Sequence, residues 1–255
     1  MNITVIKIGG SVLENLENLL TDIPDRDVII VHGGGKEVTR VAERMGKEQR
    51  FIVSPDGYRS RYTDQETIQI YQMVIAGRIN KDIVRILTRL RRRSIGICGL
   101  DSGLIRAKRK KWLIMKEEGR KKMIEGGYTG KITEVNTEFL QILLDNKIIP
   151  VIGALAIGEE FEPLNVDADR VVAAISRAMD IEKIVFFTDQ DGILDSNGKT
   201  IPQIRKSQLS KIKVGFGMKE KILGCMEAQT KQMIIANGLR KNPFTSIRGT
   251  VIENE

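Results

Sequence analysis

Cysteine and histidine are scarce in this sequence of 255 residues, which contains two cysteines and one histidine. Cys98 and Cys225 stand far apart, in apolar surroundings and without the spacing of metal ligands, so we expect two reduced residues of the core. Reduced cysteines are typical of the cytoplasm, and we expect a cytoplasmic protein. His32 precedes a run of glycines, and a packed or hydrogen-bonded anchor is a better interpretation of it than a catalytic base.

Long apolar runs and aromatic residues are also in short supply. No apolar segment approaches the roughly 18 residues of a transmembrane helix, and the N-terminus leads into a strand rather than a secretory signal. Aromatic residues make up 5% of the chain, which argues against nucleic-acid modules that stack bases on exposed rings. With 41% hydrophobic residues, the chain can bury a full core, in one large α/β unit or in two closely packed lobes.

Positive charge is unevenly distributed along the chain, whose formal net charge is +8. Between Arg85 and Lys131 there are fifteen Lys or Arg and four Asp or Glu, a balance of +11, so the remainder carries −3. By itself such a cluster is more often a solvated face than a functional one. The functional alternative is a surface that attracts an acidic partner.

The segment from Ile3 to Ser11 predicts a buried strand that ends in a glycine turn. Its nearly continuous β-branched residues are typical of a strand covered on both faces. Gly9 and Gly10 let the backbone turn sharply and approach a ligand, and we expect Ser11 to cap the following helix. A helix N-terminus beside Lys7 favours a phosphate site, although a lysine at a strand end is as often solvated surface.

A second segment repeats this pattern between Val28 and Lys36. A buried strand is followed by His-Gly-Gly-Gly-Lys and an amphipathic helix. Three consecutive glycines cost backbone entropy, which indicates that the main chain itself contacts a ligand. We therefore predict that Gly34 and Gly35 donate N–H groups to a carboxylate or a phosphate.

Two arginines precede a long helix that starts near residue 63. Thr63 and Glu66 have the spacing of a capping box, and Arg59 and Arg61 stand just before it. A guanidinium beside a helix N-terminus can hold a carboxylate in a bidentate pair. An exposed arginine pair without a ligand is the equally acceptable alternative.

Further polar strand and helix ends occur in the second half of the chain. Asn165 to Asp169 opens a helix, the strand 184–187 runs into Thr-Asp-Gln-Asp-Gly at 188–192, and Gly215 to Lys221 opens the last long helix. Between residues 104 and 130, short alternating runs separated by glycines predict a β-hairpin that carries much of the basic cluster. The pattern as a whole predicts an open, mostly parallel three-layer αβα sandwich in two lobes that meet near residue 175.

Taken together, these motifs resemble the amino acid kinase family, and in particular its acetylglutamate kinase branch. The resemblance covers the whole chain and rests on six motifs in order: 7–10, 32–35, Arg61 with Thr63, 165–169, 188–192 and 217–221. Within this branch, the segments 54–63 and 125–131 look like the archaeal type. Members of that type phosphorylate the terminal carboxylate of 2-aminoadipate or glutamate while its amino group is attached to LysW, a small acidic carrier protein.

The resemblance implies a role for each matching residue. The catalytic set would be Lys7, Lys221 and Asp169, with the aspartate orienting both ammonium groups. The substrate would be held by Gly34, Gly35, Arg61 and Asn165. The nucleotide would be held by Gly9, Gly10, Thr188, Asp189, Gly192, Gly217 and Met218. The carrier would dock on the basic region, which makes the functional interpretation of that charge the stronger one.

The resemblance also implies ATP, with Mg²⁺ held mainly by the ATP phosphates and water and by no protein ligand. Residues 1–175 would form the substrate-binding lobe, with a dimerisation surface, and residues 176–255 the ATP-binding lobe. Because the chain starts directly at its first strand, we expect a homodimer without arginine inhibition.

Three alternatives stay open at this point. The first is a kinase of free N-acetyl-L-glutamate. The second, a nucleoside-monophosphate kinase, is disfavoured by Arg61 and the segment Asn165–Asp169. The third, a regulator that binds nucleic acid or an effector without catalysis, would explain the basic region but not the two lysines.

Overall fold

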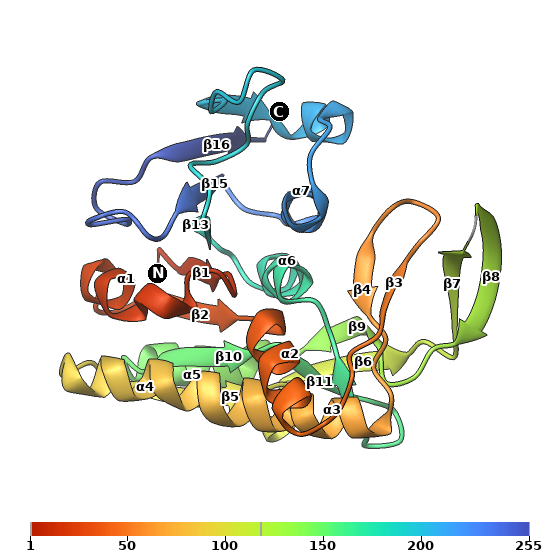
Figure 1. The fold of residues 1–255 in the computed structure, drawn as a ribbon. Helices are drawn as coiled ribbons and strands as arrows, with labels where there is room; N and C mark the ends of the chain where they lie inside the picture. The colour runs from red at the N-terminus through yellow and green to blue at the C-terminus, as the bar shows by residue number, and fades with distance from the viewer. Residues whose placement is uncertain (1, 118, 255) are drawn as a thin grey trace.

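The computed structural model describes residues 2–117 and 119–254. Its centre is an eight-stranded sheet with the order β14-β16-β15-β13-β1-β2-β10-β5, in which every neighbouring pair is parallel except β15 and β16 (Figure 1). The strands are β1 (Thr4–Ile8), β2 (Val28–His32), β5 (Ser94–Cys98), β10 (Ile149–Gly153), β13 (Lys183–Thr188), β14 (Gln203–Arg205), β15 (Gln232–Asn237) and β16 (Gly249–Glu253). The expected mostly parallel α/β sheet is confirmed.

Helices cover both faces of this sheet, which makes the three layers. One face is covered by α1 (Leu16–Asp22), α2 (Gly35–Arg44), α3 (Gln65–Gln72) and α4 (Asn80–Arg89), with a π-helical segment, Met73–Ile79, joining the last two. The other face is covered by α5 (Thr137–Asp145), α6 (Ala168–Ala178) and α7 (Phe216–Glu227). Short 3₁₀ turns occur at Leu13–Asn15, Asp101–Gly103 and Lys206–Lys211.

The side chains of the central strands alternate strictly between two hydrophobic cores. In β1, Val5 packs under α5–α7, whereas Ile6 and Ile8 pack under α1–α4. In β13, Phe186 and Phe187 are divided between the two cores in the same way. This period of two is why an almost continuous apolar run is required when both faces are buried.

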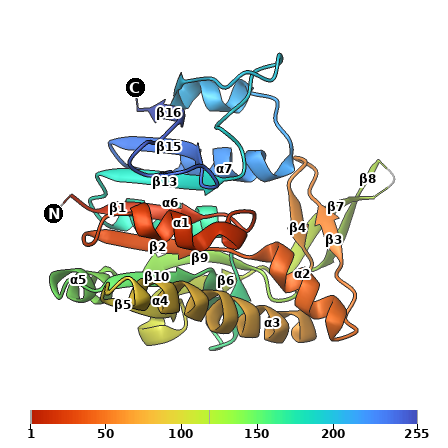
Figure 2. The same ribbon diagram turned by 60° about the vertical axis from the view of Figure 1, so that its left-hand side comes forward.

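Smaller sheets project from one end of the molecule (Figures 1 and 2). A four-stranded sheet has the order β12-β11-β6-β9, and two hairpins, β3–β4 and β7–β8, rise beside each other. Their strands are β3 (Phe51–Val53), β4 (Arg59–Arg61), β6 (Ile105–Arg109), β7 (Trp112–Glu117), β8 (Arg120–Glu125), β9 (Gly130–Val135), β11 (Leu155–Ile157) and β12 (Pro163–Asn165). The hairpin expected between residues 104 and 130 is therefore confirmed as β7–β8.

Two expected helix caps are wrong. Ser11 makes no cap, because a turn and a 3₁₀ segment separate it from α1. The helix near residue 63 is capped by Asp64, whose carboxylate accepts the N–H of Thr67 at 2.8 Å. The Thr63 hydroxyl instead accepts a hydrogen bond from Asn165 at 2.9 Å. Both Asp and Thr cap helices well, so the sequence alone did not separate these neighbours.

The basic region of the sequence is divided by the fold into two distant parts. Arg85 to Arg93 lie at the C-terminal end of α4, at the opposite side from the β7–β8 hairpin (Figures 1 and 2). Three of these five arginines are neutralised locally, in the pairs Arg85–Asp82, Arg89–Glu17 and Arg92–Asp25. Only the second part, Ile105–Lys131, with ten Lys or Arg against three Glu, can act on a partner at the hairpin end.

The predicted boundary between lobes near residue 175 does not interrupt the core. β1 pairs directly with β13, and both hydrophobic cores contain residues from before and after this position. The two lobes thus share one sheet, and the division between substrate and ATP lobes stays a functional prediction.

Candidate active site

A cleft of about 1290 Å³ opens at the carboxyl ends of β1, β2 and β13. Because β1 is the strand from which the chain order runs outward in both directions, this edge is where ligands of open α/β sheets bind. The predicted site residues that line it are Lys7, Gly10, Gly34, Gly35, Arg61, Asn165, Asp169, Thr188, Asp189, Gly217, Met218 and Lys221. Residues from six separate motifs therefore meet in one cavity.

Lys7 is positioned by the alternation of β1. It follows Val5 by two residues, so its side chain points to the face covered by α6, and its Nζ lies 2.7 Å from Oδ1 of Asp169 in that helix. Lys7 is 6% exposed and Asp169 3%. Burial disfavours the charged amine, but the adjacent Asp169 carboxylate holds the pKa of Lys7 above its usual value. Lys7 is thus a buried ammonium that is charged at neutral pH.

The same Asp169 oxygen makes no well-directed hydrogen bond within the described part of the chain. The Lys7 contact is a close ion pair that lacks hydrogen-bond alignment. Asp169 therefore keeps the capacity to accept a better-directed donor when the cleft fills.

Lys221 approaches from α7, which packs directly against α6. Its Nζ donates to the Gly217 carbonyl at 3.2 Å, and no carboxylate of the described residues pairs with it. Burial, reinforced by the positive charge of Lys7, lowers the pKa of Lys221. The pKa of the neighbouring Glu220 is shifted upward, to about 7, by burial and by the carboxylates of Asp167 and Asp169.

The two glycine turns lie against each other. A Cβ on Gly10 would stand 3.7 Å from the Gly34 Cα. Gly34, the residue before α2, has a φ of +155°, and a Cβ there would lie 2.1 Å from Cδ1 of Ile79. Among the described residues, no backbone carbonyl accepts the N–H of Gly34 or Gly35, so both can donate to an anion at the helix N-terminus.

Arg61 and Asn165 lie on the other side of these turns. The buried Arg61 guanidinium donates to the Gly35 carbonyl at 2.7 Å, to the Thr39 hydroxyl at 2.9 Å and to Gln49. Asn165 donates its amide to Thr63 and is fixed by its own N–H on the Tyr128 carbonyl at 2.8 Å. Arg61 therefore braces the glycine turn, and its grip on a substrate carboxylate stays a prediction.

Gly9 and Gly192 are the two predicted nucleotide contacts that do not line the cleft. A Cβ on Gly9 would stand 2.8 Å from the Phe187 carbonyl oxygen, and one on Gly192 would stand 2.6 Å from the Thr250 hydroxyl. Gly192 also has a φ of +120°. Close packing of the backbone accounts for both glycines, and their contact with a nucleotide stays a prediction.

His32 is the buried anchor that its position suggested. By the alternation of β2 its ring points toward α4, where Asn80 Nδ2 lies 3.2 Å from Nε2, while Nδ1 lies 3.0 Å from the Gly33 carbonyl oxygen. Burial lowers the pKa of His32 to about 4. The neutral ring therefore ties the glycine turn to the helix behind it and faces away from the cleft.

Several charged residues of the cleft were missed by sequence reasoning. They are Lys36, Lys110, Asp167, Arg170, Lys213 and Glu220. Lys110 is half-buried at the root of the β7–β8 hairpin, where burial and the nearby Arg170 lower its pKa. Lys36, Asp167, Arg170 and Glu220 lie in or next to a motif at positions that the motif leaves variable. Lys110 and Lys213 lie outside every motif, so only the fold places them in the cleft.

The remaining sequence expectations concern cysteines, metals and membranes. Both cysteines are free and buried, and burial raises the pKa of Cys98 to about 11. In the described part of the chain, no group of three or more His, Cys, Asp or Glu side chains could hold a metal ion. Within residues 2–117 and 119–254, no helix has both the length and the hydropathy to span a bilayer.

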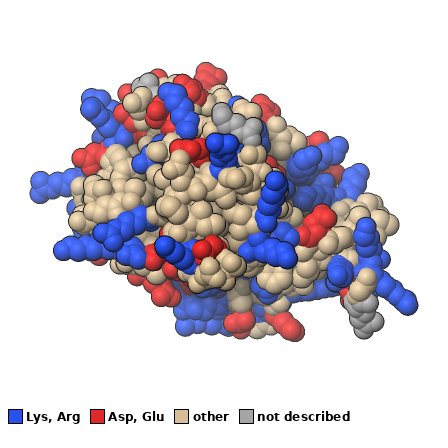
Figure 3. All heavy atoms as spheres, turned by 90° about the horizontal axis from the view of Figure 1, so that it is seen from above, with Lys and Arg blue, Asp and Glu red and all other residues tan. Residues whose placement is uncertain are grey.

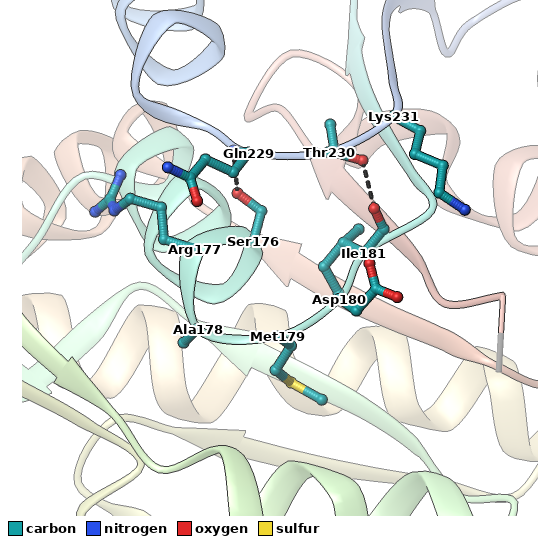
Figure 4. A pocket seen from close by; sticks show the side chains of 9 residues that line it. All are labelled: Ser176, Arg177, Ala178, Met179, Asp180, Ile181, Gln229, Thr230 and Lys231. Carbon is teal, nitrogen blue, oxygen red and sulfur yellow. Dashed lines mark hydrogen bonds between the residues drawn. The ribbon is translucent and has the colours of Figure 1, made fainter.

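A second, smaller cavity of about 460 Å³ lies at the C-terminal end of α6 (Figure 4). Its polar groups are occupied by the protein itself, since Ser176 Oγ accepts the Gln229 N–H at 3.0 Å and Thr230 Oγ1 donates to the Ile181 carbonyl at 2.7 Å. These contacts join the loop after α7 to the loop after α6. The cavity lies between packed segments and is lined by no glycine, and its two cations are already bonded, Arg177 to the Glu227 carbonyl at 2.7 Å and Lys231 to Glu182 at 2.6 Å.

A parallel sheet with glycine turns, free N–H groups and two lysines at its central carboxyl edge is the arrangement of a phosphate-binding α/β protein. The sequence profile of the Amino acid kinase family matches residues 2–237. The chain belongs to the amino acid kinase family, and its predicted classification as a phosphotransferase enzyme is thereby confirmed. Kinase activity implies the use of ATP.

Close relatives match along nearly the whole chain. A protein of Saccharolobus islandicus named [LysW]-aminoadipate/[LysW]-glutamate kinase is 40% identical over 263 residues, covering 98% of this chain and 99% of its own. A protein of Cenarchaeum symbiosum, named as a candidate for the same activity, is 47% identical over 251 residues and covers 94% of each chain.

Solved structures share the fold at low identity. N-acetylglutamate synthase from Neisseria gonorrhoeae, complexed with coenzyme A and N-acetyl-glutamate, aligns with a TM-score of 0.81 at 20% identity; the alignment covers all of this chain and 60% of the synthase. Carbamate kinase from Giardia lamblia, bound to AMP-PNP, aligns with a TM-score of 0.64 at 13% identity over 100% of this chain and 99% of its own. These similarities confirm the expected fold.

Proposed function

We propose that this protein transfers the γ-phosphoryl group of ATP to the side-chain carboxylate of 2-aminoadipate or glutamate while the amino acid is attached to a small acidic carrier protein of the LysW type. The products would be ADP and an acyl phosphate for lysine or arginine biosynthesis. The observation that carries this proposal is the full-length identity of 40–47% to relatives named for that reaction.

The cleft supports phosphoryl transfer without a general base. A carboxylate is already ionised at neutral pH, so catalysis falls to positioning and to charge stabilisation. Lys7 and Lys221 would neutralise the transferring phosphoryl group from opposite sides, and Asp169 would hold Lys7 in place. The neutral, buried His32 has no part in proton transfer.

The acceptor would lie against the glycine turns. The free N–H groups of Gly34 and Gly35 would bind the reacting carboxylate at the N-terminus of α2. Arg61 would bind the α-carboxylate, and Asn165 would add a side-chain bond on the same wall. A binding site distinguishes two substrates that differ by one methylene by only about 1–3 kcal/mol. These contacts would therefore accept both glutamate and 2-aminoadipate.

ATP would supply the phosphoryl group and Mg²⁺ would accompany it on the phosphates. The lining residues Gly10, Thr188, Asp189, Gly217 and Met218 belong to the half of the cleft between β1, β13 and α7, which fits a nucleotide. Mg²⁺ dehydrates reluctantly, so it would keep several of its waters and bind mainly through the ATP phosphates.

The proposal is tested by ADP release and by hydroxylamine trapping of the acyl phosphate. Three substrates are compared: free N-acetyl-L-glutamate, glutamate on the carrier and 2-aminoadipate on the carrier. Turnover of only the carrier-linked forms supports the proposal, and their ratio assigns the enzyme to arginine or lysine biosynthesis. Turnover of free N-acetylglutamate alone would overturn it in favour of an acetylglutamate kinase.

We also propose that the enzyme is a cytoplasmic homodimer, with residues 1–175 holding the acceptor and residues 176–255 holding ATP. The distribution of the cleft residues supports this assignment, since the four acceptor residues all lie before residue 175 and four of the five ATP residues, all but Gly10, lie after it. Light scattering of the purified protein tests the dimer, and turnover in the presence of arginine tests the expected absence of feedback inhibition.

A further inference from the structure

The outer face of the β7–β8 hairpin carries an uncovered apolar cluster. The register pairs Trp112 with Glu125, Ile114 with Met123 and Lys116 with Lys121 on this face. Trp112 is 62% exposed, Ile114 52% and Met123 64%. Side chains this large and this exposed, gathered on one face, are typical of an interaction site.

The inner face of the same hairpin is already occupied. Met115 is buried and receives a contact from Arg50, beside the β3–β4 hairpin. On the same inner face Lys122 pairs with Glu117 at 2.7 Å. The contrast shows that the hairpin needs only its inner face to pack against the rest of the molecule.

The outer face ends in two lysines that oppose each other. Lys116 and Lys121 are direct cross-strand partners, and no described carboxylate lies within ion-pair distance of either. Like charges directly opposite on a sheet are destabilising, so an external anionic group would relieve this pair. The surrounding surface is rich in Lys and Arg at this end of the molecule (Figure 3).

The hairpin also adjoins the cleft. Leu113 and Ile114 line the same cavity as Lys7 and Asn165. A substrate tethered to a protein must enter this cavity while the body of the carrier stays outside. A carrier in that position would lie against the hairpin.

We infer that the outer face of β7–β8, with Trp112, Ile114 and Met123 at its centre and Lys116 and Lys121 at its tip, is the docking surface for the acidic carrier protein. This inference rests on the proposed function and names the part of the enzyme that the carrier contacts. An apolar centre with an aromatic anchor supplies affinity, and a charged rim supplies orientation and association rate. A second copy of this chain is a poorer occupant because it would bring the same two lysines into the interface.

Two basic residues at the root of the hairpin, Arg109 and Lys110, already have other roles in the structure. Arg109 donates to the Gly127 carbonyl at 2.6 Å and stacks on Tyr128 at 4.3 Å, so it holds the root of the hairpin. Lys110 lines the cleft. The residues free to meet a partner are those farther out, toward the tip.

The test measures turnover of 2-aminoadipate attached to a LysW-type carrier by two double variants. Trp112→Ser with Met123→Ser should raise the KM for the carrier-linked substrate about tenfold or more at all salt concentrations, since apolar anchors are not screened. Lys116→Glu with Lys121→Glu should raise this KM about tenfold at low salt and much less at 0.5 M salt. In both variants kcat and the KM for ATP should match the wild type, which also verifies folding.

Matched controls carry the same changes elsewhere. Ile142→Ser removes a 51% exposed apolar side chain from α5, and Arg91→Glu reverses an exposed charge of the basic sequence cluster at the end of α4. Both should leave the KM for the carrier unchanged.

Three results would overturn the inference. The first is an unchanged KM in both hairpin variants while the wild type uses the carrier-linked substrate, which would leave the proposed function standing. The second is dissociation of a wild-type dimer by the hairpin changes with an unchanged KM, which would assign the face to self-association. The third is wild-type turnover of free N-acetylglutamate alone, which would remove the proposed function itself.

Discussion

Lys7 and Lys221 lie in the same cleft, but the protein holds them in different ways. Lys7 is buried in a strand of the central sheet, paired with Asp169 at 2.7 Å, and its pKa is raised. Lys221 stands in the first turns of α7, where its one hydrogen bond among the described residues goes to a carbonyl of its own helix, and its pKa is lowered. One cation is fixed before any ligand binds, and the other is held without an anion.

This difference suggests how the cleft is completed. A cation whose pKa is lowered by burial and by a neighbouring positive charge gains most from an arriving phosphate. On the proposed function, the Lys7 side of the cleft would be preorganised, whereas the Lys221 side would be completed by the bound nucleotide. Four predictions test this contrast, from the largest expected effect to the smallest.

Loss of either lysine should abolish most of the turnover. Lys7→Ala and Lys221→Ala each remove one donor to the developing charge, so kcat should fall about 10²-fold or more. Steady-state ADP release measures the effect, and Lys211→Ala, at an exposed position outside the cleft, is the control. Wild-type kcat in either cleft variant would remove that lysine from the mechanism.

Stability should separate the two lysines. Lys7→Met leaves the Asp169 carboxylate buried without its cation, which should lower the free energy of unfolding by roughly 3 kcal/mol. Lys221→Met leaves no carboxylate without its paired cation, so it should change the free energy of unfolding by less than about 0.5 kcal/mol. Denaturant unfolding measures both, and Lys7→Met with Asp169→Asn should recover much of the loss. Equal losses for the two single variants would contradict the contrast.

The pH dependence of ATP binding should report on the Lys221 side. The pKa of Glu220 is about 7, so above pH 7 its carboxylate ionises beside Lys221 and competes with the ATP phosphates. The KM for ATP should therefore rise about three- to tenfold between pH 6 and pH 8. Glu220→Gln should flatten this rise while leaving the low-pH value unchanged; a rise that persists in the variant would assign it to another group.

The smallest effect concerns the position of α7 itself. Lys219 donates to the Asp56 carbonyl and lies 4.6 Å from the centre of the Tyr58 ring, so it links α7 to the β3–β4 hairpin across the mouth of the cleft. Lys219→Ala should raise the KM for ATP and for the acceptor about two- to threefold, since one exposed hydrogen bond contributes about 0.5–1 kcal/mol. Unchanged KM values would show that α7 is positioned without this link.

Sequence periodicity accounts for much of the site. The alternation of β1 places Lys7 on the face covered by α6, and that of β2 turns His32 away toward α4, so both environments follow from a period of two. The order of the motifs along the chain predicted both the family and a mostly parallel sheet. These features are local or repeat at fixed intervals, which is why one sequence suffices for them.

The missed features depend on how distant segments meet. Arg85–Arg93 and the hairpin are close in sequence, yet α4 carries the arginines to the far side of the molecule. Lys110, which follows β6, reaches the cleft near Arg170 of α6 because β9 of the four-stranded sheet packs against that helix. Gly9 and Gly192 are motif glycines that pack closely against Phe187 of β13 and Thr250 of β16. These strands lie far from the glycines in the sequence, so the contacts appear only in the fold.

The contact between Gly34 and Ile79 offers a route to altering the enzyme. Ile79 is buried in the π-helical segment behind the glycine turn, and its Cδ1 occupies the space that a Cβ on Gly34 would need. The position of the Gly34 N–H is therefore set by a side chain that does not line the cleft. If the acceptor binds at Gly34 as proposed, replacing Ile79 with Val or Leu would shift that donor by small steps, so position 79 is a starting point for engineering acceptor length from outside the cleft.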